Sequence, residues 1–211
     1  MVRWAVRRRF HNVTGFVLAG GESRRMGRPK QGLVLDHETM LRRQLRILSQ
    51  VCSSVAMAGL PRMPLDSYVP VFADLFPGRG PLGGIYTGLV HTRTDYNLIL
   101  ACDLPFLRSD FLEYLCFRAI ESAADATVPR TAGYRLQPLC AVYRRRIRGI
   151  FRTSLENGIG RISRLFPKVR CEILTAPELA RHGFSEAIFA NMNSPADYDA
   201  ARRRMEAQAY S

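Results

Sequence analysis

The sequence predicts an α/β fold, a three-layer domain built around one mostly parallel sheet. Short apolar runs that suit buried strands alternate with segments whose apolar residues recur at helical spacing. The chain has 211 residues, of which 47% are hydrophobic, enough for one sizeable core and too apolar for a disordered chain. The sequence contains no repeats, low-complexity tracts or long linkers. We therefore predict a basic N-terminal extension over residues 1–12 and a single domain over residues 13–211.

In the first half of the chain we expect strand, helix, strand and strand. Residues 14–19 are a short apolar run followed by paired glycines, which is typical of a buried strand that feeds a loop. Residues 39–51 are expected to be helical, because their leucines lie at helical spacing and arginines occupy the other face. Residues 53–58 and 68–72 are the next predicted strands, and prolines bound the second of them.

The second half continues the alternation of helices and strands. A glycine-rich turn opens the predicted helix at residues 83–91, and residues 96–102 are the most apolar predicted strand. Ser109 is predicted to cap a helix that runs to residue 122. The remaining predicted elements are strands at residues 126–128, 137–143 and 170–174 and a terminal helix at residues 195–207. This alternation predicts a Rossmann-like sheet, in which ligands bind beyond the carboxyl ends of the strands.

The net charge of +13 and the pI near 10.3 indicate anionic partners. Nucleic acid is one interpretation, and nucleotides or phosphorylated small molecules are another. The basic clusters at residues 3–9, 42–46 and 144–152, the last joined by Arg161 and Arg164, lack the interleaved aromatic residues of a base-stacking surface. Solvated helix faces explain the same clusters, so we expect no nucleic-acid partner.

The five cysteines are widely spaced and never form a Cys-x-x-Cys pair, which favours reduced thiols in a cytoplasmic protein. No apolar run approaches the ~20 residues that a membrane helix needs, so we expect no membrane partner. Residues 7–10 weakly resemble a twin-arginine export signal. The apolar stretch behind them is short and is better explained as the first strand, so we expect a cytoplasmic protein.

A candidate phosphate loop follows the first predicted strand, where residues 18–30 are LAGGESRRMGRPK. Paired glycines, here Gly20 and Gly21, let backbone N–H groups approach phosphate oxygens. Three cationic side chains would neutralise a polyphosphate, namely Arg24, Arg25 and Lys30. The spacing matches neither G-x-x-x-x-G-K-[ST] nor G-x-G-x-x-G, and a basic surface loop is the alternative.

Two further segments carry an acidic residue near a predicted turn. Asp74 precedes the glycine-rich helix entry at Gly80, Pro81 and Leu82, and its carboxylate can accept hydrogen bonds from a base or a ribose. A turn and cap without a ligand is the alternative there. Asp103 ends the most apolar predicted strand, where a carboxylate suits Mg²⁺, and an N-cap or turn aspartate is the alternative. Cys102 is interpreted as a buried packing residue.

The last third of the chain has candidate groups for a second substrate. Residues 135–143 are a predicted strand with a polar entry. Residues 157–161 can form an anion-binding turn, although Gly158 is equally well explained as a helix C-cap. Asn191 and Asn193 point to one face of an extended segment, and their amides can bind phosphate, base or ribose groups. Asn193 can instead serve only the turn before the terminal helix.

These segments resemble those of a known enzyme family. The loop LAGGESRRMGRPK looks like the signature of nucleotide-diphosphate-sugar-type nucleotidyltransferases, and within them it is closest to the molybdenum cofactor guanylyltransferases. The segments GPLGGI, CDLPF and NMNSP follow in that family's order, so the resemblance covers residues 18–197. Related cytidylyltransferases tend to have alanine and then glycine where this chain has two glycines, which favours GTP. Arg79 departs from the pattern of members in which prolyl-glycine leads directly into Pro-Leu.

The resemblance implies a nucleotidyltransferase domain that joins GMP from GTP to the terminal phosphate of molybdopterin or its metal-loaded form. It implies Mg²⁺ as the cofactor, bound by Asp103, and catalytic roles for Arg25, Lys30 and Asp103. Pathway proteins or molybdoenzyme chaperones are further expected partners. The implied nucleotide-binding residues are Leu18, Ala19, Gly20, Gly21, Lys30, Asp74, Gly80, Pro81 and Leu82, and the implied acceptor-binding residues are Asn191 and Asn193.

Three alternatives stay open. A related nucleotidyltransferase would use CTP, or a cobinamide or sugar-phosphate acceptor, with nearly the same loops. A basic nucleic-acid-binding protein would use the positive charge but leaves the glycine loops and Asp103 unexplained. A degenerate member that acts as a delivery partner is disfavoured, because every motif residue is present.

Overall fold

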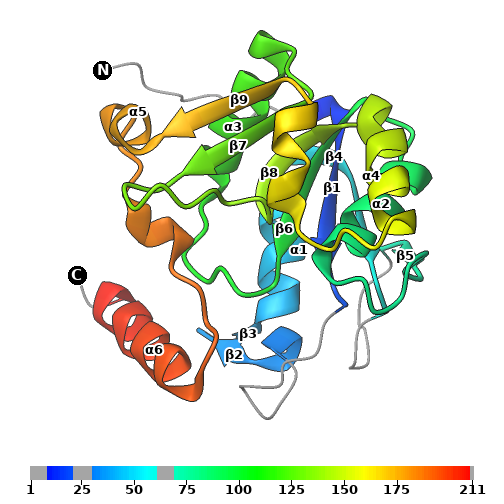
Figure 1. The fold of residues 1–211 in the computed structure, drawn as a ribbon. Coiled ribbons are helices and arrows are strands. Elements are labelled where there is room, and N and C mark those ends of the chain that lie inside the picture. Colours follow the sequence, from blue (N-terminus) through cyan, green and yellow to red (C-terminus); the bar gives the residue numbers. More distant parts are fainter. Residues whose placement is uncertain (1–8, 21–29, 61–68, 210–211) are drawn as a thin grey trace.

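The computed structural model describes residues 9–20, 30–60 and 69–209 (Figure 1). Its main strands are β1 (Phe10–Leu18), β4 (Cys52–Ala58), β5 (Val71–Phe72), β6 (Tyr96–Ala101), β7 (Ala126–Arg130), β8 (Cys140–Arg144) and β9 (Cys171–Thr175). A separate hairpin consists of β2 (Val34–Leu35) and β3 (Glu38–Thr39). The helices are α1 (Met40–Val51), α2 (Pro81–His91), α3 (Ser109–Ser122), α4 (Arg148–Glu156), α5 (Ala176–Arg181) and α6 (Pro195–Ala209).

The seven main strands form one sheet in the order β5-β4-β1-β6-β8-β7-β9. Strand β8 runs antiparallel to β6 and β7, and the other neighbours are parallel. All of β6 and the second half of β1 are buried, as expected for central strands that helices cover on both faces. The predicted mostly parallel α/β sheet is confirmed.

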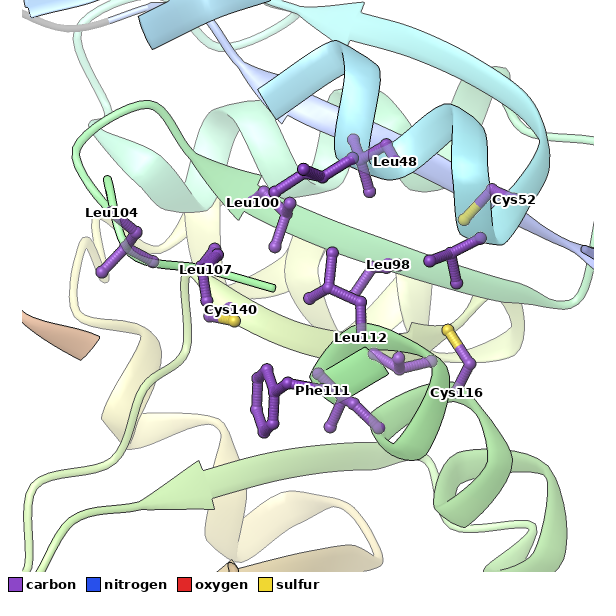
Figure 2. Close-up of a cluster of buried hydrophobic side chains, with 14 of the residues drawn as sticks. Leu48, Cys52, Leu98, Leu100, Leu104, Leu107, Phe111, Leu112, Cys116 and Cys140 are labelled. Atoms are coloured by element: carbon purple, nitrogen blue, oxygen red, sulfur yellow. The ribbon is translucent and has the colours of Figure 1, made fainter. Parts of the chain in front are cut away.

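Helices cover both faces of the sheet, so the domain has three layers. On one face α1 and α3 pack against β6, where Leu98 and Leu100 lie between Leu48 of α1 and Leu112 of α3 (Figure 2). On the other face α2 and α4 pack together over a second cluster, in which Ile99 belongs to β6. Alternate residues of β6 thus serve opposite cores, which explains why Leu98, Ile99 and Leu100 are all apolar.

A smaller third cluster fastens the C-terminal helix to the β2–β3 hairpin. Leu35, Met40 and Met192 are buried there together with Ala201 of α6. The Tyr198 hydroxyl of α6 also donates a hydrogen bond to the carbonyl of Val34 at 2.7 Å. This packing holds the segment just before α6 against the part of the chain that precedes α1.

Two predicted helix starts are wrong. Helix α2 begins at Pro81 rather than at residue 83, because proline has the helical φ and needs no N–H partner in the first turn. Helix α3 begins at Ser109 itself, so Arg108 is the N-cap, and its side chain makes no capping hydrogen bond. The preference for serine at N-caps led to the wrong residue, because the helix begins one residue earlier than predicted.

Several strand and helix boundaries also differ from the prediction. Strand β1 begins at Phe10, and β8 begins at Cys140 because the Cys140 N–H closes a turn on the carbonyl of Gln137. Only Val71 and Phe72 of the predicted strand at residues 68–72 form β5, and residue 68 lies outside the described residues. The sequence analysis missed the β2–β3 hairpin, α4 and α5.

Several arginines of the basic clusters belong to structural ion pairs. Arg46 donates to Glu38 at 2.9 Å, and Arg152 donates to Glu156 at 2.8 Å. Arg144 pairs with Asp95 across the end of the sheet. These contacts support the interpretation of the clusters as paired, solvated surfaces. Residues 1–8, which hold most of the first cluster, lie outside the described residues.

All five cysteines are free, and four of them are buried. The absence of a disulfide agrees with the prediction of reduced thiols. Within residues 9–20, 30–60 and 69–209, no helix combines the length and apolar character needed to cross a membrane.

The ends of β1 and β4 approach each other so closely that one position requires glycine. The Ala19 N–H donates to the carbonyl of Ala58 at 2.9 Å. Gly59 follows with a φ of 92°, and a Cβ built on it would lie 2.6 Å from the backbone nitrogen of Gly20. Any side chain at residue 59 would push the start of the 20–30 loop away from β4.

We expect Gly59→Ala to lower the free energy of unfolding by about 2–3 kcal/mol, since alanine must adopt a left-handed conformation and clash with Gly20. Urea unfolding monitored by circular dichroism measures the change. Gly149→Ala in α4 is the matched control, because a Cβ there meets nothing within 4 Å and the helix gains up to ~1 kcal/mol. Equal stability of the two variants would contradict the packing described here.

Candidate active site

The candidate site lies beyond the carboxyl ends of β1 and β6, where the sheet stops growing on one side and continues on the other. Strands β1 and β6 are parallel neighbours, and Leu18 pairs with Ala101 at their carboxyl ends. From β1 the chain continues to β4 on one side, whereas β6 leads to the other half of the sheet. Such a switch point leaves a crevice beyond the strand ends, in which α/β proteins bind ligands. The segments after Leu18 and after Ala101 therefore leave the sheet side by side.

Three predicted residues meet beyond this point. The Lys30 Nζ donates to Asp103 Oδ2 at 3.1 Å and to Asn193 Oδ1 at 2.7 Å. The Lys30 and Asp103 side chains are 19% and 22% exposed, so the pair is shielded but open to a ligand. The structure thus joins the basic loop, the Asp103 turn and the C-terminal asparagine segment in one polar cluster.

Gln31 returns the basic loop to the sheet. Residues Lys30–Gly32 form a short 3-10 turn, and the buried Gln31 side chain donates through Nε2 to the carbonyl of Ala19. This contact ties the end of the loop to its beginning and delivers Lys30 to the strand ends. The sequence analysis missed Gln31, because a glutamine beside a lysine carries no pattern that distinguishes it from a surface residue.

Helix α1 braces the turn that carries Asp103. Gln44 is fully buried and its Nε2 donates to the carbonyl of Leu104 at 2.8 Å, while Arg43 Nε donates to the carbonyl of Pro105 at 2.8 Å. Burial lowers the pKa of the Arg43 guanidinium, and the nearby Arg46 lowers it further. From the other side, the Met192 N–H donates to the carbonyl of Asp103 at 2.9 Å. The sequence analysis did not single out these bracing residues.

Cys102 is a packing residue. Its side chain is buried, and its Sγ donates a weak hydrogen bond to the carbonyl of Leu18 at 3.5 Å. Burial raises the pKa of the Cys102 thiol to about 12, and the Asp103 carboxylate raises it as well. The thiol is therefore protonated at neutral pH and is no nucleophile.

Asn193 is held by the N-terminus of α6. The Ser194 Oγ accepts from the Asp197 N–H at 3.3 Å, and Asp197 Oδ2 accepts from the N–H groups of Ser194 at 2.8 Å and Asn193 at 2.9 Å. This reciprocal pattern is a capping box. The N–H groups of Asn193 and Ser194 keep the pKa of Asp197 below its ordinary value. The backbone N–H of Asn193 thus belongs to the turn before α6, and its side-chain oxygen belongs to the polar cluster. Asn191 is exposed.

Asp74 lies against the first turn of α2. Its Oδ1 accepts from the Phe76 N–H at 2.9 Å. A Cβ on Gly83 would lie 2.9 Å from the same oxygen, so the carboxylate packs where only glycine leaves room. Gly80 is the N-cap of α2, and Pro81 and Leu82 are its first residues. These contacts give Asp74 a structural role, and its binding of a nucleotide stays a prediction.

Other predicted residues have mixed outcomes. Helix α4 ends at Glu156, and its C-cap is Asn157 rather than the predicted Gly158. Gly158 follows with a φ of 73°, and the Ile159 N–H donates to the carbonyl of Ser154 at 2.8 Å, so the glycine closes the end of the helix one residue after the cap. Gly20 follows β1 and is exposed, beside the buried Ala19. Gly21, Arg24 and Arg25 lie outside the described residues.

The polar cluster offers one carboxylate to a metal ion. Across the described ranges of the chain, no group of three or more histidine, cysteine, aspartate and glutamate side chains could hold one. Mg²⁺ fits such a site, because proteins often hold it with one or two carboxylates while waters and substrate phosphates complete the shell. One carboxylate therefore suffices if the phosphates of a bound nucleotide supply further ligands to the metal ion.

The chain is similar in sequence to proteins of one family. The sequence model of the MobA-like NTP transferase domain matches residues 15–171. A probable molybdenum cofactor guanylyltransferase of Pelotomaculum thermopropionicum is 34% identical over 191 residues, which cover 90% of this chain and 92% of that protein. A molybdenum cofactor guanylyltransferase of Desulfosudis oleivorans is 33% identical over 197 residues, which cover 92% and 96%.

Solved structures share the fold. Molybdopterin-guanine dinucleotide biosynthesis protein A from Archaeoglobus fulgidus superposes with a TM-score of 0.79 at 22% identity, over 92% of this chain and 99% of that one. The 2-C-methyl-D-erythritol 4-phosphate cytidylyltransferase from Thermus thermophilus superposes with a TM-score of 0.66 at 13% identity, over 90% and 98%. The family match spans most of the chain and both relatives exceed 30% identity, so the chain belongs to the MobA-like NTP transferase family.

Proposed function

We propose that this chain is a molybdenum cofactor guanylyltransferase, which transfers GMP from GTP to the terminal phosphate of molybdopterin or its metal-loaded form. The products are the guanine dinucleotide cofactor and pyrophosphate. The observation that carries the proposal is the convergence of Lys30, Asp103 and Asn193 at the β1–β6 switch point. The names of the two relatives supply the substrates.

In this reaction an oxygen of the acceptor phosphate attacks the α-phosphorus of GTP. The new P–O bond forms as the bond to the β-phosphate breaks, and the electron pair leaves with pyrophosphate. The attacking phosphate is already ionised at neutral pH, so no general base is needed. In phosphoryl transfer the protein mainly positions the reactants and stabilises charge. We assign both tasks to the cluster of Lys30, Asp103 and Asn193.

The roles follow from position. Leu18, Ala19 and Gly20 begin the loop whose N–H groups would face the triphosphate, and Lys30 would neutralise its charge. Asn193 is in contact with Lys30, so an acceptor phosphate bound there would lie beside the nucleotide phosphates. We also propose that Asn191 binds the acceptor and that Gly80, the N-cap of α2, binds the nucleotide.

We further propose Mg²⁺ as the metal, with the Asp103 carboxylate as its protein ligand. When bound, the ion would neutralise charge that builds up on the α-phosphate. Lys30 then has a second function, because its ammonium group holds the Asp103 carboxylate in place at 3.1 Å before a ligand arrives. The three hydrogen bonds to the backbone carbonyls of residues 103–105 hold this turn in place before a ligand binds.

The alternative with CTP has support in the fold, since a cytidylyltransferase superposes on most of this chain. A transfer assay with molybdopterin and each α-labelled nucleoside triphosphate separates the two. We expect labelled dinucleotide product with GTP only. Product with CTP would keep the reaction class and overturn the choice of base, and no transfer with any nucleotide would refute the proposal.

We expect Asp103→Asn to lower kcat by at least ~100-fold, comparable with the loss of one group that stabilises charge in a transition state. Steady-state assays at saturating Mg²⁺ measure it. Asp110→Asn is the control, because that carboxylate pairs with the exposed Arg108 on the surface. Thermal unfolding checks that both variants fold, and a kcat of Asp103→Asn within about tenfold of the wild type would remove Asp103 from the reaction.

A further inference from the structure

Thr87 is a buried residue of α2 that is bonded to the loop after β5. Its side chain is 0% exposed, so its hydroxyl group needs partners inside the protein. The Thr87 Oγ1 accepts a hydrogen bond from the Leu75 N–H at 3.0 Å and donates to the carbonyl of Gly83 at 2.9 Å. The hydroxyl therefore joins the loop after β5 to the first turn of α2, which packs beside β5 (Figure 1).

The two hydrogen bonds of Thr87 have different reach. A threonine inside a helix often donates to the carbonyl four residues earlier, and the bond to Gly83 is such a local contact. The bond to Leu75 links residues 12 positions apart in the chain. Among the described residues only Thr87 accepts from the Leu75 N–H. The loop therefore depends on this hydroxyl for its attachment at Leu75.

The same hydroxyl lies against Asp74, the predicted nucleotide-binding carboxylate. The Thr87 Oγ1 is 3.4 Å from Asp74 Oδ1, which also accepts from the Phe76 N–H at 2.9 Å. A Cβ on Gly83 would lie 3.1 Å from Asp74 Oδ2. In the part of the chain that the structure describes, no hydrogen bond reaches Oδ2, so this oxygen is available to a ligand. Thr87 thus fixes one carboxylate oxygen and leaves the other for binding.

The loop held by Thr87 continues into the N-terminus of α2. The Arg79 N–H donates to the carbonyl of Phe76 at 3.2 Å, and the Gly83 N–H donates to the carbonyl of Gly80 at 3.1 Å. These bonds connect the turn after β5 to the N-cap of α2. A change at Thr87 is therefore transmitted to both predicted nucleotide-binding places, the carboxylate and the helix entry.

We propose that Thr87 is a positioning residue for the nucleotide. The buried hydroxyl does not itself reach a ligand, and it holds the Asp74 carboxylate and the Gly80 entry in the arrangement that a base and ribose would bind. The proposal rests on the proposed function and on the predicted nucleotide role of Asp74. Because these groups would bind the base and ribose rather than the reacting phosphates, displacing them weakens binding and leaves the chemical step unchanged.

Two substitutions at Thr87 separate the hydroxyl from the rest of the side chain. Thr87→Val keeps nearly the same shape and removes the hydroxyl, whereas Thr87→Ser keeps the hydroxyl and removes a methyl group. Thr127→Val is the matched control, because Thr127 in β7 is also buried and its Oγ1 has no hydrogen-bond partner among the described residues. Calorimetric titration with GTP and Mg²⁺ and steady-state transfer assays use the full chain, and thermal unfolding checks that the variants fold.

We expect Thr87→Val to raise the Kd and the KM for GTP about fivefold, the size of one lost hydrogen bond, with kcat unchanged. Thr87→Ser and Thr127→Val should bind GTP as the wild type does. The Leu75 amide should also exchange with solvent faster in Thr87→Val, as measured by NMR-detected hydrogen exchange without nucleotide.

Equal GTP affinity of Thr87→Val and the wild type would overturn the proposal, whatever the stability of the variant. An equal loss of affinity in Thr87→Ser and Thr87→Val would overturn it as well, because the methyl group rather than the hydroxyl would then matter. A wild type that binds no GTP would refute the proposed function. Faster exchange of the Leu75 amide in Thr87→Val would in that case still show that the hydroxyl holds the loop.

Discussion

The site depends on one nitrogen atom, the Nζ of Lys30. It contacts a carboxylate 73 residues away and an amide 163 residues away, so three distant segments of the chain have a common partner. A carboxylate and an amide oxygen both accept from its ammonium group, in surroundings that exclude much of the water. If Lys30 were displaced, Asp103 would lose its neutralising partner and Asn193 would lose its contact with the loop. The geometry of the site is therefore one interdependent arrangement.

The fold brings this nitrogen to its place through backbone contacts. Gln31 fastens the returning loop to Ala19, Gln44 holds the Asp103 turn from α1, and the Met192 N–H joins the C-terminal segment to the same turn. Each contact uses a backbone carbonyl near the end of a central strand, where parallel sheets leave polar groups available. Reacting groups that are held before the substrate binds need little reorganisation during the reaction.

The sequence allowed the sheet, the basic loop, Asp103 and the asparagine segment to be predicted, because each follows an apolar run or carries a motif. It did not allow Gln31 or Gln44 to be predicted, because their partners are backbone carbonyls that only the tertiary structure brings near. Helix α4 was missed because it is only nine residues long and has a glycine as its second residue, and α5 because it is only six residues long. The prediction of Ser109 as the N-cap of α3 was wrong, because the N-cap is the residue with extended backbone angles just before the helix, and that residue is Arg108.

The most direct measurement is calorimetric titration of GTP, with Mg²⁺, into the wild type and Lys30→Ala. Lys168→Ala serves as the control, because Lys168 is exposed on a 3-10 turn outside the site. Our account predicts that Lys30→Ala binds GTP roughly tenfold or more weakly, as expected for the loss of a charge-assisted hydrogen bond, whereas Lys168→Ala binds as the wild type. Equal affinity of Lys30→Ala and the wild type would contradict the central claim, that Lys30, at the meeting point of the three segments, binds the nucleotide.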